Sequence, residues 1–149
     1  MIYISIPGLP PSTNTAYIDI VIGKGRSRSI KRVLTKEGKA YKTKTTAYIV
    51  EHYPTLLTMF KPNTPYGYIV QLVFPNLLNK TWPAEAKTRY KKLDATNRSK
   101  LFEDAMAEAF GVDDSVFLTT RYDKIQGEEQ TNIWVWNMEE EAPYSGRAG

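Results

Sequence analysis

The amino-acid sequence predicts a single α+β domain, built on a mixed, mainly antiparallel sheet with helices packed on one side. The length of 149 residues suits one domain with a sizeable core. Stretches of alternating apolar and polar residues, typical of strands with one buried face, occur at both ends of the chain. Two longer stretches between them carry the end signals of helices. We expect the domain to span residues 1–138, and an acidic, small-residue and mobile tail to span residues 139–149.

The first half of the chain predicts a strand, a hairpin and a helix. Isoleucine recurs at every second position over residues 2–6, which predicts a strand that the following prolines end. Residues 17–22 and 29–34 are expected to be the arms of a hairpin, because a glycine-containing turn separates them. Thr35 is a favoured N-cap residue, and the helix that follows it is expected to run to about His52.

The second half predicts a core strand, a second helix and a second hairpin. Residues 66–74 are almost continuously apolar and form the clearest core strand. The polar segment 75–92 has no strong period, which at this length is typical of a functional or mobile segment. A helix is expected over residues 96–110, where an apolar stripe precedes a glycine. Residues 115–125 and 131–138 are expected to pair with each other as a hairpin.

The composition narrows the function classes. The chain has no cysteine and one histidine, which excludes disulfides, thiol nucleophiles and multi-histidine metal sites. No apolar run approaches the length of a membrane span, so we expect a cytoplasmic protein with no membrane partner. The formal charge is +4, with nine cations against one acid over residues 24–44 and six against one over residues 87–100. One such run is usually a solvated face, but two in a small domain favour nucleic acid.

The polar residues around the second helix are the candidates for chemistry. Asn97, Lys100 and Asp104 are three and four residues apart and share one helix face, while Asp94 lies just before the first turn. These residues also have a purely structural interpretation, in which Asp94 is an N-cap and Lys100 pairs with Asp104 at the surface. As a functional site they offer only oxygen ligands, which suit Mg²⁺ or Mn²⁺.

Asp113 and Asp114 follow the end of this helix and extend the acidic set. The helix is about 22 Å long at 1.5 Å per residue, so Asp94 and Asp114 do not meet along its axis. They come together only if the chain turns back along the helix or if two chains pair, and the sequence does not choose between these. The structural alternative is that the two aspartates only form a turn after Gly111.

Two segments of the chain carry a family resemblance. The first comprises IPGLPPSTNTAY at residues 6–17 and LTKEGKAYK at residues 34–42, and the second is DATNRSKLFEDAMAEAFGVDDSVF at residues 94–117. They resemble the RusA family of Holliday junction resolvases, found in bacteria and their prophages, and imply its fold. The family pattern in the second segment is Asp-x-Asp-Asn-x-x-Lys-x-x-x-Asp, with a later pair of aspartates. This segment is the more specific one, because five polar positions keep their spacing.

The resemblance implies a role for each matching residue. Asp94 matches a metal ligand, and Lys100 matches the catalytic lysine. Asp113 and Asp114 match the aspartates that complete the metal site, with Asp114 the preferred ligand. Two further matches are to supporting positions, namely Asn97 and Asp104. Thr96 departs from the pattern, because it stands where the family usually has a second aspartate.

The implied function is a Mg²⁺-dependent endonuclease, with Mn²⁺ as a substitute, that acts as a homodimer on branched DNA. It would cut four-way junctions by paired nicks in recombination and repair. Lys91, Lys92 and Arg98 flank Asp94 and are candidate phosphate contacts, and the resemblance adds Asn14 to the DNA surface. One alternative is a DNA-binding protein on the same fold without catalysis, marked by the lost carboxylate at position 96. Another is an interaction domain that uses a face with Trp134 and Trp136.

Overall fold

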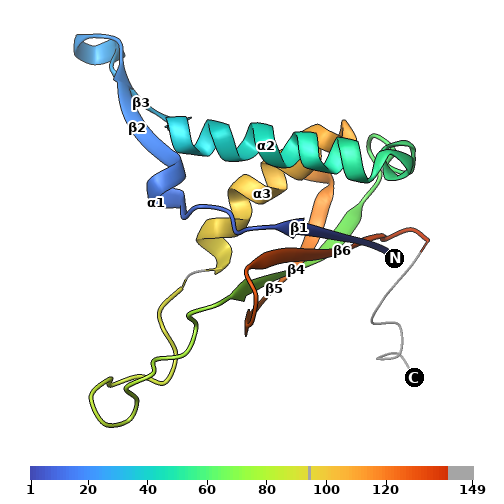
Figure 1. Ribbon diagram of the computed structural model, residues 1–149. Helices are drawn as coiled ribbons and strands as arrows, with labels where there is room; N and C mark the ends of the chain where they lie inside the picture. Colours follow the sequence, from blue (N-terminus) through green and yellow to red (C-terminus); the bar gives the residue numbers. More distant parts are fainter. Residues whose placement is uncertain (94, 141–149) are drawn as a thin grey trace.

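The protein consists of a four-stranded sheet covered on one face by two helices, with a two-stranded hairpin projecting from the body (Figure 1). A computed structural model describes residues 1–93 and 95–140, but not the side chains of Thr13, Thr96 and Asn97. The predicted tail therefore lies outside the described residues from position 141 onward. The elements are β1 (Ile2–Pro7), α1 (Thr13–Ala16), β2 (Tyr17–Ile22), η1 (Gly25–Ser27), β3 (Ser29–Leu34), α2 (Lys36–His52), η2 (Pro54–Thr58), β4 (Tyr66–Phe74), α3 (Ala95–Phe110), η3 (Asp114–Val116), β5 (Phe117–Gln126) and β6 (Gln130–Asn137).

The sheet is mixed and mainly antiparallel, as predicted. Its strand order is β1-β6-β4-β5, with β6 antiparallel to both of its neighbours and β5 parallel to β4. The helices α2 and α3 lie together over one face, where Thr46 donates a hydrogen bond to the carbonyl of Ala105. The described helices include none that is long and apolar enough to cross a membrane.

The hairpin predicted for residues 115–125 and 131–138 is wrong. The two strands run antiparallel but do not pair, because β4 lies between them. The connection crosses the end of β4, where the Gly127 amide donates to the Phe74 carbonyl at 3.1 Å. A short turn with glycine is the local signal of a hairpin. The strongly apolar β4 instead takes a central position, in which both of its edges are hydrogen-bonded and most of its side chains are buried.

The core lies between the helices and one face of the sheet. Ile4 of β1 pairs with Ile133 of β6, and both are fully buried beneath the helices together with alternate residues of β4. Complete burial of one such side chain contributes about 1.5–3 kcal/mol. The helix side contributes Leu101, Phe102, Ala105 and Met106. The apolar stripe predicted for the second helix therefore faces the sheet, which leaves the opposite face of that helix for polar residues.

The helix ends match the sequence signals. Thr35 caps α2 by accepting a hydrogen bond from the Gly38 amide at 3.1 Å. Gly111 follows α3 with φ of +67°, the left-handed conformation that glycine adopts without strain. The first predicted hairpin forms as expected, with β2 paired to β3 over residues 17–34.

The helix-free face of the sheet is packed with aromatic side chains at one end. Trp134 and Trp136 share this face, as their spacing predicts, and Trp136 is buried against Gly67. A side chain at Gly67 would overlap the Trp136 ring, so this position needs glycine for packing. Trp134 contacts Tyr3 with 5.2 Å between the ring centroids.

Candidate active site

The exposed side of α3 presents Lys100 and Asp104 one helical turn apart. The ion pairs between described residues do not include one joining these two side chains. Asp104 instead accepts a hydrogen bond on Oδ2 from the hydroxyl of Tyr17, at 2.9 Å. The Lys100 ammonium lies 5.9 Å from the centroid of the Tyr17 ring. A tyrosine from the first of the two family segments therefore orients one predicted residue of the second segment and contacts another.

Tyr17 is held in place by the root of the hairpin. It is the first residue of β2, directly after α1, and pairs with Leu34 at the base of the ribbon. The Thr35 hydroxyl donates to the Thr15 carbonyl at 2.7 Å, which ties the start of α2 to α1. Gly38 allows this close approach, because any side chain there would overlap the backbone carbonyl of Ala16. Segments near residues 17 and 35 are thus fixed beside α3 before any ligand binds.

The hydroxyl of Tyr17 remains a hydrogen-bond donor at neutral pH. Burial raises its pKa well above the ordinary value, and the hydrogen bond and negative charge of Asp104 raise it further. The group is therefore suited to positioning the Asp104 carboxylate, and it is not suited to act as a base.

Glu103 is a further carboxylate at this site that the sequence analysis missed. It is half-buried and accepts a hydrogen bond from the Tyr68 hydroxyl of β4 at 2.8 Å. Burial raises the pKa of Glu103, and the charges of Asp114 and Asp104 raise it further, while the Tyr68 hydrogen bond and Lys100 lower it. The sequence signal that could have found Glu103 was its position three residues after Lys100 on the same helix. Its partner Tyr68 is distant in the sequence, and only the fold brings the two side chains together.

The two aspartates after α3 have different environments. Asp113 caps η3 by accepting from the Ser115 amide at 2.9 Å, and this hydrogen bond lowers its pKa. Burial raises the pKa of Asp114, and the neighbouring charges of Asp104 and Asp113 raise it further. The chain return after α3 therefore brings Asp114 within electrostatic influence of Asp104 and Glu103 in one chain. The structure groups these carboxylates near Lys100, whose positive charge offsets part of the rise in the pKa of Glu103 and Asp114.

Part of the predicted metal site lies outside the described residues. Asp94 is not described, nor are the side chains of Asn97 and Thr96. Among residues 1–93 and 95–140, no three acidic or histidine side chains are arranged so that they could hold a metal ion. The described carboxylates do have the oxygen chemistry that Mg²⁺ prefers. Burial first, and then neighbouring negative charges that a cation would offset, raise the pKa values of Glu103 and Asp114.

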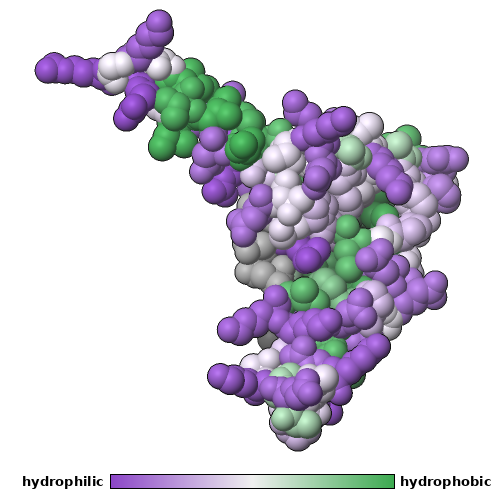
Figure 2. Space-filling model, turned by 60° about the vertical axis from the view of Figure 1, so that its left-hand side comes forward, coloured by the Kyte–Doolittle hydropathy of each residue, from purple (hydrophilic) through white to green (hydrophobic). Residues whose placement is uncertain are grey.

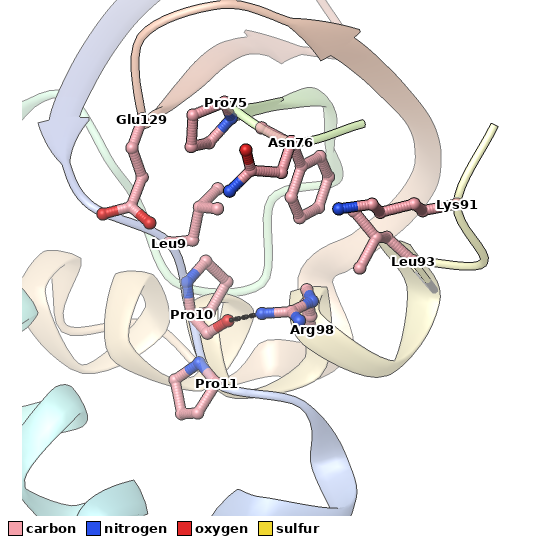
Figure 3. A pocket seen from close by; sticks show the side chains of 10 residues that line it. Leu9, Pro10, Pro11, Pro75, Asn76, Lys91, Leu93, Arg98 and Glu129 are labelled. Carbon is pink, nitrogen blue, oxygen red and sulfur yellow. Dashed lines mark hydrogen bonds between the residues drawn. The ribbon is translucent and has the colours of Figure 1, made fainter. Parts of the chain in front are cut away.

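The predicted DNA contacts divide into anchored and exposed residues. Arg98 lines a pocket of about 370 Å³ near the start of α3, where its Nη1 donates to the Pro10 carbonyl at 2.9 Å (Figure 3). Its guanidinium also lies 5.5 Å from the centroid of the Phe74 ring. Lys91 lines the same pocket with much of its side chain in solvent, and Lys92 is exposed beside it.

Asn14, the fourth predicted DNA contact, is exposed on α1. Three residues further along the chain is Tyr17, which contacts Lys100 and Asp104. The arginine therefore fastens the Pro10 loop to α3, while the lysines and the asparagine remain accessible on either side of the site.

A lysine grouped with acidic side chains on the surface of a basic α+β domain is typical of enzymes that cleave phosphodiesters. The Endodeoxyribonuclease RusA family matches residues 9–135 of the 149-residue chain. The chain belongs to the RusA endodeoxyribonuclease family, which places it among nucleases that cut within DNA. No curated protein matches the chain.

Proposed function

We propose that this protein is a metal-dependent endonuclease that resolves four-way DNA junctions by paired nicks, in recombination and repair. Membership of the RusA family supports the nuclease class. The observation that carries the assignment is the grouping of Lys100 with Asp104, Glu103 and Asp114, in which the charge of Asp104 helps to raise the pKa of the other two carboxyls. Carboxyls with raised pKa values grouped beside one cation are typical of functional sites.

The acidic residues are proposed to hold Mg²⁺, for which Mn²⁺ would substitute. Asp94 and Asp114 are the proposed ligands, with Asp113 assisting through the oxygen that does not cap η3. When bound, such an ion would lower the pKa of water and offset charge on the phosphate. Glu103 adds a carboxylate to a site in which Thr96 replaces the acid of the family pattern, and Tyr68 holds it in position.

Lys100 is proposed to act on the cleaved phosphate. Its ammonium is exposed at the end of a flexible side chain and contacts the face of Tyr17. A cation at this place stabilises the charge that builds up on the phosphate oxygens in the transition state. Asp104 supports the site, because the hydrogen bond from Tyr17 to its Oδ2 fixes the orientation of the whole carboxylate.

The protein is proposed to work as a homodimer. A four-way junction needs two matched nicks, and two-fold symmetry supplies two equivalent sites and a continuous basic surface. Lys91 and Lys92 on one segment and Asn14 on another would then contact phosphates of separate DNA arms. Arg98 would act by holding the Pro10 loop and by its charge.

The test is incubation of the purified protein with a labelled four-way junction in Mg²⁺ or Mn²⁺. We expect paired nicks with the native chain, and none with Lys100→Ala or Asp94→Asn, while junction binding in EDTA is retained by both variants. Lys61→Ala is a matched control, because Lys61 is an exposed lysine next to Phe60, which stacks on Phe110 at the far end of α3 from its first turns. Native-like cleavage by either site variant would refute the assignment. Binding without nicks by the native chain in both metals would instead favour a DNA-binding protein without catalysis.

A further inference from the structure

The β2–β3 hairpin forms a ribbon of its own, separate from the main sheet. Its strands pair from Tyr17 and Leu34 at the root to Ile22 and Ser29 near the tip. The ribbon projects away from the body on the side where α1 and the first turns of α3 lie (Figure 1). Six residues at about 3.3 Å each carry it roughly 20 Å from the site residue Tyr17.

Positive charge is concentrated toward the tip of this ribbon. Residues 17–34 contain five cations and a single acid, Asp19. That acid forms an ion pair with Arg32 at 3.1 Å. The other cations of the ribbon are exposed and form no ion pair with a described residue: Lys24, Arg26, Arg28 and Lys31. Unpaired positive charges at the end of a projecting ribbon attract a polyanion.

The shaft of the ribbon is apolar and unusually exposed. Ile18, Ile20 and Ile22 follow one face with exposed fractions between 40% and 53%. On the other face Val21 pairs with Ile30, which is 74% exposed. Figure 2 shows this hydrophobic band on the projecting ribbon, between the body and a hydrophilic tip. A two-stranded hairpin is marginally stable alone in water, so this surface is fitted to be covered by a partner.

Duplex DNA is the partner whose chemistry fits both features. A two-stranded ribbon has the width of the major groove, and cations at its tip meet phosphates on the groove walls. Apolar side chains of DNA-binding proteins also pack against sugars and unstacked bases, which a branched molecule offers near its branch point. The charge pattern favours DNA over a second copy of this chain, because the ribbon would bring like charges together in a symmetric contact.

We propose that the β2–β3 ribbon binds a duplex arm of the junction about six base pairs from the phosphate that is cleaved. The spacing follows from the length of roughly 20 Å and a rise of about 3.4 Å per base pair. This inference rests on the proposed function. Because Tyr17 begins the ribbon and also holds Asp104, a DNA arm bound by the ribbon is placed in register with Lys100.

The test compares the full-length chain with a variant carrying Lys24→Ser, Arg26→Ser and Arg28→Ser. Binding of a fluorescent four-way junction is measured in EDTA over a series of salt concentrations. We expect the affinity of the variant to fall at least tenfold and its salt slope to decrease by about 2–3, since each lost phosphate contact removes about 0.9. The matched control carries the same charge change at three exposed lysines outside the ribbon: Lys39, Lys61 and Lys124.

A second readout uses junctions with shortened arms. Trimming the arms below about six base pairs should weaken binding of the native chain and leave the tip variant unaffected. Equal affinity and equal salt slope for the tip and control variants would overturn the inference. It would also be overturned if Ile20→Ser with Ile30→Ser converted dimers to monomers without changing DNA affinity, because a second copy would then cover the shaft. Either result leaves junction cleavage by the native chain intact, whereas a native chain that neither binds nor cuts junctions refutes the proposed function itself.

Discussion

The contact between Tyr17 and Asp104 leads to a sharp prediction, because one atom can be removed without disturbing the rest. Tyr17→Phe keeps the ring beside Lys100 and deletes only the hydroxyl that donates to Asp104 at 2.9 Å. A hydrogen bond to a charged group contributes about 1.5–3 kcal/mol. Tyr17 and Asp104 are both only half-buried, so water partly replaces the hydroxyl and the lower end of this range applies. We therefore expect a loss of about 1.5 kcal/mol, or roughly tenfold in rate.

The assay is single-turnover cleavage of a labelled junction at saturating protein in Mg²⁺, with the junction Kd measured separately in EDTA. We expect the cleavage rate to fall and the Kd to change less than twofold, since the hydroxyl positions a side chain and need not bind DNA. Tyr3→Phe is the matched control, because its hydroxyl donates to Asn132 at 3.2 Å on the helix-free face of the sheet. A native cleavage rate in Tyr17→Phe would refute the positioning role, as would an equal loss in the control.

Two further predictions concern the folding of the site and sheet. Burial raises the pKa of Glu103 above the usual 4.5, so the native state loses stability as the pH rises from about 4.5 to the raised value. Glu103→Gln should remove this loss of stability and keep an acceptor for the Tyr68 hydroxyl. In EDTA its melting temperature should therefore exceed that of the native chain at pH 7, and the two should converge below pH 4.5. A constant difference across this pH range would contradict a raised pKa of Glu103. Gly67→Ala should lower stability by about 2 kcal/mol or more in urea unfolding, because the added methyl group overlaps the Trp136 ring, and a change under 0.5 kcal/mol would contradict the packing.

Local sequence signals were sufficient for most of the secondary structure. The alternation of isoleucines over residues 2–6, the cap at Thr35 and the glycine after Phe110 each depend on neighbours along the chain. The pairing of β5 and β6 was mispredicted because it depends on a strand that is distant in the sequence. A three-residue connection with Gly127 predicts a hairpin, and the insertion of β4 depends on competition between strands that no local pattern records.

The sequence by itself determined the basic charge, the oxygen-only ligand set and the polar face of α3 with Lys100 and Asp104, because these follow from composition and helical spacing. Only the tertiary structure placed Tyr17 on Asp104, Tyr68 on Glu103 and Asp114 near both carboxylates. Those contacts join residues separated by ten to almost ninety positions, and they exist because β4, α3 and the hairpin root pack around a shared core. Spacing along a helix selects which side chains share a face, whereas the approach of other elements decides their partners, their burial and their charge.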